Sequence, residues 1–244
     1  MSGRDGIATV TPNPALDLTT LLPRLLPGAV NRVREAREDP GGKGINVAGF
    51  LAAQGEGLAL SATGWLGEAN AGAFRGFLGA AGIADRFVGV SGSTRTNVKI
   101  VEDDQRVTDL NFPGFSVDGA AERALLEAVA ALAEGQAWVA LCGSLPRGAS
   151  PDLHARLAGA ARGAGARVLL DASGPPFAAA LGACPDCIKP NGEELGEVLG
   201  TRIEGVADAA GLEWGLARGI GRFAGPWPDR LLAALRRQAA GGGG

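Results

Sequence analysis

The sequence predicts an α/β fold in which a parallel sheet is covered on both faces by helices, with a small β-rich part beside it. Three observations predict this class. Strand-like and helix-like segments alternate along the chain, which is typical of a parallel sheet. Two stretches, 18–37 and 95–115, instead contain extended segments with no helix between them. The length of 244 residues and the 46% hydrophobic content are sufficient for a substantial buried core.

The N-terminal part of the chain begins this alternation. Residues 7–11 (IATVT) form an apolar run that predicts a buried strand, which must end at Pro12 and Pro14 because proline cannot donate a ladder hydrogen bond. Residues 44–54 then carry apolar side chains at helical spacing, directly after a pair of glycines. Residues 58–64 return as a strand. We therefore expect a βαβ unit here.

The same alternation continues to about residue 199. We expect helices at 70–81, 120–134, 152–163 and 193–199, and strands at 137–142, 167–171 and 187–189. The stretches 18–37 and 95–115 are expected to form short antiparallel strands that project from the main sheet.

Charge and targeting patterns exclude several classes of protein. The formal net charge is −3 and no basic stripe is present, so we expect no nucleic-acid partner. The N-terminal residues lack the apolar core of a signal peptide, and no uncharged apolar run approaches the roughly 18 residues of a membrane helix. We therefore expect no membrane partner and a cytoplasmic protein.

The cysteines and the histidine are not expected to perform chemistry. Cys142, Cys184 and Cys187 are too few for a disulfide framework and are interpreted as incidental thiols in a reducing compartment. His154 is the single histidine and lies in a helix-like segment, where we expect it at the surface. Catalysis by a Ser-His or Cys-His pair is therefore not expected.

Lysine is rare in this chain. Only three of the 23 basic residues are lysines, at positions 43, 99 and 189. Residues 39–46 (DPGGKGIN) place Lys43 between glycines, ahead of the predicted helix. Bare backbone N–H groups, a helix N-terminus and a mobile cation together would cradle an anion or a polyol. The simpler interpretation of this segment alone is a tight turn with a surface lysine, and it does not match the Walker pattern.

Five further motifs accompany this segment in a fixed order. The six are TVTPNPALD (9–17), GGKGINVA (41–48), TRTNVK (94–99), TDLNF (108–112), GSLPRG (143–148) and KPNGEEL (189–195). Together they resemble the PfkB family of carbohydrate kinases. The resemblance implies a ribokinase-like, that is Rossmann-like, sheet over residues 7–205, with a β-rich lid from about 18–37 and 95–115. It also implies a homodimer that forms through the lid.

Within that family, NPALD, GGKG, TRTNVKI and VTDLNF most resemble the 1-phosphofructokinases and the related tagatose-6-phosphate kinases. A sugar phosphate is therefore the implied small-molecule partner, with ATP-dependent conversion of D-fructose 1-phosphate to fructose 1,6-bisphosphate as the implied reaction. By resemblance, Lys43 and Arg95 hold the substrate phosphate. The other implied substrate-binding residues are Asp17, Gly41, Gly42, Asn46 and Ser144.

The last motif is the implied nucleotide element. Lys189, Asn191 and Glu194 resemble the family's N-x-x-E element, which organises ATP phosphates and Mg²⁺ at a strand end, so Glu194 would act on Mg²⁺ indirectly. Taken alone, an Asn-x-x-Glu pair is more often a helix cap.

The chain departs from the family pattern after residue 205. The family's S-L-G-x-x-G loop and G-A-G-D motif, which carries the catalytic aspartate, are not found in residues 206–244, and strand formers are scarce there. The resemblance in length and spacing persists to about residues 219–220. We interpret 206–244 as a degenerate tail, with a reading-frame shift or C-terminal loss near that point, and we identify no catalytic residue. The alternative functions are a tagatose-6-phosphate kinase and, because the catalytic aspartate motif is not found, a non-catalytic sugar-phosphate-binding fragment.

Overall fold

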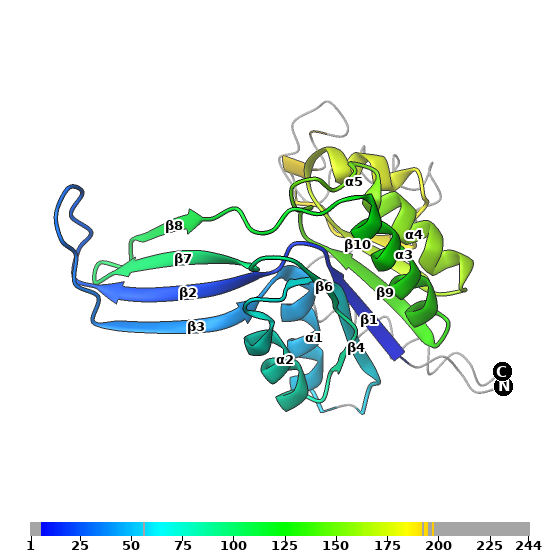
Figure 1. Ribbon diagram of the computed structural model, residues 1–244, viewed down its shortest axis with the longest axis horizontal. Coiled ribbons are helices and arrows are strands. Elements are labelled where there is room, and N and C mark those ends of the chain that lie inside the picture. The colour runs from blue at the N-terminus through cyan, green and yellow to red at the C-terminus, as the bar shows by residue number, and fades with distance from the viewer. Residues whose placement is uncertain (1–5, 56, 192, 195–196, 198–244) are drawn as a thin grey trace.

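The computed structural model describes residues 6–55, 57–191, 193–194 and 197, and these form an α/β body with a separate sheet beside it (Figure 1). The main sheet has the order β11-β10-β9-β1-β4-β5, with β6 paired to β4. Its strands are β1 (Gly6–Thr11), β4 (Leu60–Gly67), β5 (Ala84–Asp85), β6 (Val88–Val90), β9 (Gln136–Cys142), β10 (Arg167–Asp171) and β11 (Cys187–Ile188). The helices are α1 (Lys43–Ala53), α2 (Ala71–Ala80), α3 (Gly119–Ala133), α4 (Leu153–Gly163) and α5 (Gly174–Leu181).

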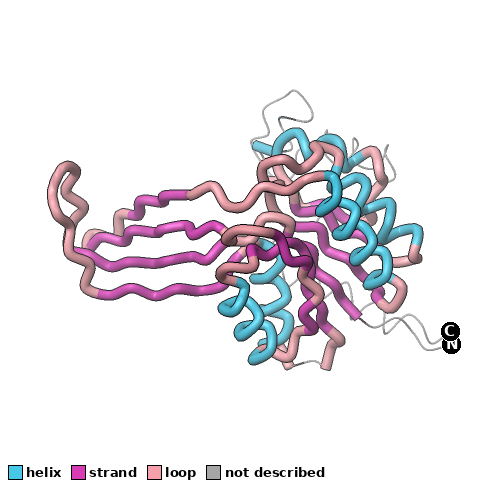
Figure 2. The backbone as a smooth tube through the Cα atoms, in the orientation of Figure 1, coloured by secondary structure: helices cyan, strands magenta, loops and turns pink. Residues whose placement is uncertain are grey.

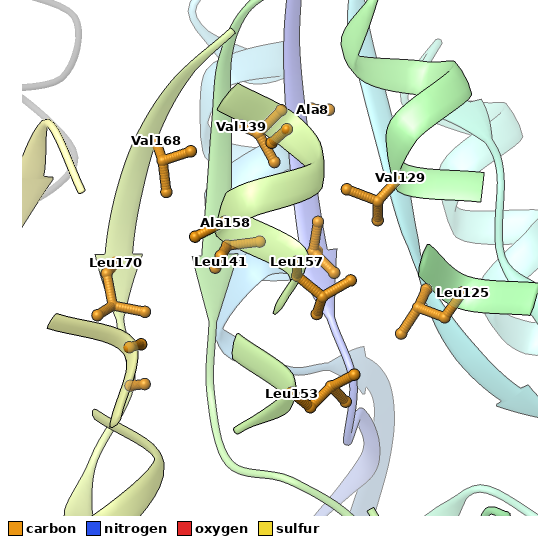
Figure 3. Close-up of a cluster of buried hydrophobic side chains, with 14 of the residues drawn as sticks. Ala8, Leu125, Val129, Val139, Leu141, Leu153, Leu157, Ala158, Val168 and Leu170 are labelled. Carbon is orange, nitrogen blue, oxygen red and sulfur yellow. The ribbon is translucent and has the colours of Figure 1, made fainter. Parts of the chain in front are cut away.

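The main sheet is parallel and buried on both faces. Every residue of β1 and of β4 is buried, as expected for parallel strands that have helices on both sides. Successive side chains of β9 point to opposite faces, so Trp138 packs with α1 and α2 whereas Val139 packs with α3, α4 and α5. Figure 3 shows the second of these clusters, which contains Leu157 of α4 together with Val139 and Leu141 of β9. The predicted fold class is confirmed.

The second sheet projects from the body (Figures 1 and 2). It has the order β3-β2-β7-β8 and consists of β2 (Ala15–Leu22), β3 (Glu35–Gly41), β7 (Arg95–Glu102) and β8 (Val107–Asn111). The pairs β2·β3 and β7·β8 are antiparallel, as predicted. The central pair β2·β7 is parallel, which corrects the expectation of an antiparallel sheet. Both hairpins leave the body through their first strand, so these two strands run in the same direction.

Several elements differ from the sequence-based expectations. Helix α5 was not predicted. Pro175 and Pro176 lie in its first turn, where a missing N–H costs nothing. His154 is fully buried, which contradicts the expected surface position, because its side of α4 packs onto the sheet. The expected helix at 193–199 falls largely outside the described residues, as does the expected tail at 206–244. No helix in the described part of the chain is long and apolar enough to cross a membrane.

Candidate functional site

The candidate site lies where the carboxyl ends of the central parallel strands meet. The chain places β4 on one side of β1 and β9 on the other, so the strand order reverses beside β1. Ligands of open α/β sheets bind at such switch points. Just after β1, the Asn13 side-chain amide donates hydrogen bonds to the Ser144 hydroxyl (3.1 Å) and to the Leu145 carbonyl (3.3 Å). The loops that follow β1 and β9 are therefore joined across this point.

The register of the projecting sheet brings three of the sequence motifs together. Ala15, at the start of β2, pairs with Gly41 of β3 on one side and with Arg95 of β7 on the other. The segments NPALD, GGKG and TRTN therefore run side by side at the base of this sheet. This arrangement places Asp17, Arg95 and the N-terminus of α1 at one junction between the body and the projecting sheet.

Asp17 is held in a defined position by its neighbours at this junction. The Asn97 side-chain amide donates a 3.1 Å hydrogen bond to Oδ1 of Asp17. A Cβ atom at Gly41 would collide with Oδ2 of the same carboxylate, so glycine is required at position 41 for Asp17 to keep its place. Asp17 is partly exposed, so a ligand can reach its carboxylate.

Helix α1 presents its N-terminus to the same junction. Gly42 is its N-cap and has φ of 133°, a conformation that favours glycine, and a Cβ atom there would lie 2.7 Å from Cγ2 of Thr11. Lys43 is the first residue of the helix, and Asn46 lies one turn later; both are exposed. The positive end of the helix and the Lys43 ammonium group together favour an anion here.

Arg95 is held at the body by the contacts of its neighbour Thr94 and by those of its own guanidinium group. Its neighbour Thr94 exchanges two backbone hydrogen bonds with the Asn70 side chain, at 2.8 and 2.9 Å. The Arg95 guanidinium itself donates to the carbonyls of Pro14 (3.3 Å) and Asn13 (3.2 Å). Burial lowers the pKa of this guanidinium, and the nearby charge of Asp17 opposes that shift. An arginine stays charged in a protein, so Arg95 offers a positioned cation.

A buried carboxylate joins two of the three lysines. Asp171 ends β10, and its side chain is only 2% exposed. Lys43 Nζ lies 2.9 Å from Oδ1, and Lys189 Nζ lies 3.6 Å from Oδ2. Burial lowers the pKa of Lys43, but the hydrogen bond and negative charge of Asp171, with a contribution from Glu194, raise it overall. The Lys43 ammonium group therefore stays protonated at neutral pH.

Asn191 and Glu194 form a reciprocal helix cap. The backbone N–H of Asn191 donates to Oε2 of Glu194 (2.9 Å), and the backbone N–H of Glu194 donates to Oδ1 of Asn191 (2.8 Å). This is the geometry of a capping box, so the observed contacts of this pair are those of a helix cap. The pair also lies just beyond β11, on the edge that carries Lys189.

The structure thus gathers the predicted site residues along one edge and adds three that were not predicted. Asn13, Asn97 and Asp171 were missed. The first two lie inside the quoted motifs, so their amides could have been proposed from the sequence. Asp171 ends a predicted strand, and its position at a carboxyl end was the available signal.

Comparisons with known proteins place this geometry in a family context. Residues 13–218 match the model of the pfkB family carbohydrate kinases. The 1-phosphofructokinase of Rhodobacter capsulatus is 52% identical over 213 residues, which are 84% of this chain and 66% of that protein. The 1-phosphofructokinase of Xanthomonas campestris pv. campestris is 45% identical over 221 residues, 87% of this chain and 68% of that protein.

A solved structure shares the fold. The tetrameric inhibited form of phosphofructokinase-2 from Escherichia coli superposes with a TM-score of 0.79 at 26% identity, over 89% of this chain and 71% of that one. The chain spans about two thirds of the length of the curated relatives named above.

Proposed function

This chain belongs to the pfkB family of carbohydrate kinases, and we propose that the enzyme it forms transfers the γ-phosphoryl group of ATP to D-fructose 1-phosphate. The products would be fructose 1,6-bisphosphate and ADP. The similarity to two 1-phosphofructokinases supports this substrate. The described residues would supply the binding part of the reaction.

The pairing of Ala15 with both Gly41 and Arg95 is the observation that carries this proposal. It places an arginine on one side of the NPALD strand and the N-terminus of α1, with Lys43, on the other. A sugar phosphate needs charge-assisted donors for its phosphate group, and Arg95 and Lys43 fit that need. Its hydroxyls need an acceptor, and the Asp17 carboxylate fits that role.

The remaining predicted residues complete the proposed sugar site. Gly41 leaves the space that the Asp17 carboxylate fills, and Gly42 lets the backbone turn into α1. Asn46 is exposed one turn into that helix, where its amide could bind a hydroxyl. Ser144 would add a hydroxyl from the loop after β9, and its position is maintained by Asn13.

We assign the ATP phosphates to the edge beyond β10 and β11. Lys189 would contact them, and the Asn191–Glu194 cap would face them at the start of a helix. Among the described residues, no three His, Cys, Asp or Glu side chains gather into a metal site. Mg²⁺ in kinases is commonly held by one or two carboxylates together with water and substrate phosphates. The Glu194 carboxylate fits such an indirect role, in which the ion neutralises phosphate charge.

Phosphoryl transfer also requires a base and donors that stabilise the moving group. We identified no residue for these roles in the sequence, and residues 198–244 lie outside the described part of the chain. Binding and transfer therefore require separate experiments. Binding without transfer would favour a sugar-phosphate-binding role for the chain as given.

We also propose that residues 7–205 form one domain and that its projecting sheet closes over the sugar as a lid, with two lids pairing in a homodimer. The edge strand β8 supports this, because Val107 and Leu110 are about half exposed on it (48% and 45%). An open edge that carries apolar side chains favours pairing with another chain. Light scattering should show a dimer at micromolar concentration, and a monodisperse monomer would contradict this proposal.

Calorimetry with fructose 1-phosphate tests the binding part. Loss of one charge-assisted hydrogen bond costs about 1.5–3 kcal/mol, so Arg95→Ala should weaken binding by roughly tenfold to a hundredfold. Lys99→Ala is the matched control, because Lys99 lies on the same strand but is exposed and far from the junction. Equal affinity of wild type and Arg95→Ala would remove Arg95 from the site.

A second titration with tagatose 6-phosphate tests which ketose phosphate the site prefers. Tighter binding of tagatose 6-phosphate would replace the proposed substrate. A coupled assay with fructose 1-phosphate, ATP and Mg²⁺ tests transfer, and turnover near the typical ~1–100 s⁻¹ of kinases would establish that the chain as given is catalytic.

A further inference from the structure

Asp171 connects two parts of the site that lie far apart in the sequence. Its Oδ1 faces Lys43 from the start of α1, and its Oδ2 faces Lys189 from the end of β11. The two lysines approach different oxygens, so neither displaces the other. A single carboxylate therefore bridges the GGKG segment and the KPN segment.

The backbone around Asp171 fixes the carboxylate. The Asp171 carbonyl accepts a 2.8 Å hydrogen bond from the N–H of Gly143, and the N–H of Lys189 donates to the Leu170 carbonyl at 3.0 Å. These bonds tie the ends of β9, β10 and β11 together. The carboxylate thus rests on a rigid part of the molecule, whereas the lysine side chains are 45% and 25% exposed and can adjust.

The positive charges of Lys43 and Lys189 exceed the negative charge of Asp171. A carboxylate that is 2% exposed needs compensation, because an unpaired buried charge is costly. One lysine would be sufficient for that purpose, yet two are present, so these three side chains have a net charge of about +1, which the nearby Glu194 carboxylate offsets in part. The excess positive charge faces the edge where we place the substrate phosphates.

We propose that Asp171 is a positioning residue that couples Lys43 to Lys189, so that an anion bound at Lys43 changes how Lys189 is held. This inference rests on the proposed function, in which Lys43 binds the sugar phosphate and Lys189 faces the nucleotide phosphates. An ammonium group has three donors. A phosphate dianion beside Lys43 competes with Oδ1 for them, which leaves the fixed carboxylate less compensated. The Lys189 ammonium group, 3.6 Å from Oδ2, can then move closer to it.

Lysine-selective NMR of the full chain tests this coupling. Only three lysines are present, so protein labelled with ¹³C at lysine Cε gives three side-chain signals, which Lys→Arg substitutions assign. The probe is fructose 1-phosphate alone, without nucleotide. In the wild-type protein we expect the signals of Lys43 and Lys189 to shift with the same midpoint, while the exposed Lys99 stays unchanged.

Asp171→Asn separates coupling from direct contact. The amide keeps the shape of the side chain and removes its charge, so the Lys43 signal should still respond to the sugar phosphate whereas the Lys189 response should be lost. A Lys189 response that persists in Asp171→Asn would mean direct contact with the ligand and would overturn the inference. A wild-type response at Lys43 without one at Lys189 would also overturn it.

A second variant keeps the test valid if Asp171→Asn does not fold. Lys189→Gln changes a partly exposed side chain and leaves Asp171 with Lys43 alone. The Lys43 signal of the ligand-free protein should then shift, and Lys99→Gln, as the control, should leave it in place. An unchanged Lys43 signal in Lys189→Gln would overturn the coupling. If fructose 1-phosphate leaves the Lys43 signal of the wild type unmoved, the proposed sugar-phosphate site itself fails, and this inference fails with it.

Discussion

The two sheets of the molecule differ most in what their strands contact. Every residue of β4 in the body is buried, whereas four of the five residues of β8 in the projecting sheet are exposed. The body is covered by helices on both faces, and its clusters contain the large apolar side chains. Among the described residues, helices contact the projecting sheet only at its base, where Leu16 of β2 packs with α1 and α2, and none runs along its outer part (Figure 2).

Polar contacts compensate for the missing core in the projecting sheet. Glu102 of β7 is buried and accepts two hydrogen bonds from the Arg106 guanidinium, which closes the β7–β8 turn. Asn97 and Asp17 link the neighbouring strands β7 and β2. We therefore expect stability to depend mainly on the body, and the proposed sugar-phosphate affinity to depend mainly on polar groups at the junction of the two sheets.

The largest effect is expected for a core substitution in the body. Trp65 of β4 is fully buried and its indole N–H donates to the Ala121 carbonyl (3.2 Å). Trp65→Ala should lower the free energy of unfolding by about 3–5 kcal/mol, because it removes a large apolar side chain and leaves a cavity. Val30→Ala is the control, because Val30 is 84% exposed in the loop between β2 and β3, and it should change this free energy by less than about 0.5 kcal/mol. Urea unfolding measures both, and similar effects of the two would refute the proposed division.

A second prediction concerns acid sensitivity of the body. Burial lowers the pKa of His154 from 6.5 to about 4, and its Nε2–H donates to the Gly143 carbonyl (3.1 Å). Between pH 6.5 and 4 the unfolded chain therefore binds the proton more readily than the folded one. The stability this group contributes above pH 6.5 is lost as the pH falls towards 4, by about 3 kcal/mol.

His154→Gln isolates that contribution. Glutamine can still donate to the Gly143 carbonyl but does not titrate, so the loss of unfolding free energy from pH 7 to pH 4 should be smaller in the variant. Denaturant unfolding at a series of pH values measures the difference. Parallel curves for the variant and the wild type would show that His154 does not become protonated on unfolding in this range.

A substitution at the junction should change sugar-phosphate affinity but not the free energy of unfolding. An added Cβ in Gly41→Ala would displace the Asp17 carboxylate, which is a movable side-chain end, so the fold should be nearly unaffected. Fructose 1-phosphate binding should weaken by roughly tenfold to a hundredfold, the equivalent of one charge-assisted hydrogen bond. Calorimetry and urea unfolding of the same preparation separate the two effects. A large loss of unfolding free energy with unchanged affinity would show that Gly41 supports the fold and not the binding of the sugar phosphate.

The smallest effect is expected for a glycine in a body helix. Gly72 lies in α2, and a Cβ atom there would meet no neighbour within 4 Å. Because alanine has the higher helix propensity but Gly72 lies in the first turn of α2, Gly72→Ala should stabilise the protein by less than the ~0.5–1 kcal/mol typical of a mid-helix glycine. Sugar-phosphate affinity should stay unchanged, which makes this variant the matched control for Gly41→Ala. A destabilised Gly72→Ala would show that the face of α2 at Gly72 is not open.

Much of the body could be predicted from local patterns. Strand β10 has the predicted limits, and α3 and α4 lie within a residue or two of the predicted helices. The order of six motifs identified the family, which the match over residues 13–218 confirms. That match extends beyond residue 205, where the predicted domain ends. The roles of individual site residues remain proposals.

What the sequence determined by itself is the kind of each element, because side-chain periodicity and glycine or proline positions act within one segment. Only the tertiary structure decided which elements meet. The parallel pairing of β2 with β7 depends on two hairpins that leave the body in the same direction. The Lys43–Asp171 contact joins residues 128 positions apart, and the burial of His154 depends on which side of α4 packs onto the sheet. Strand order and packing set these contacts, and neither is encoded in a local pattern.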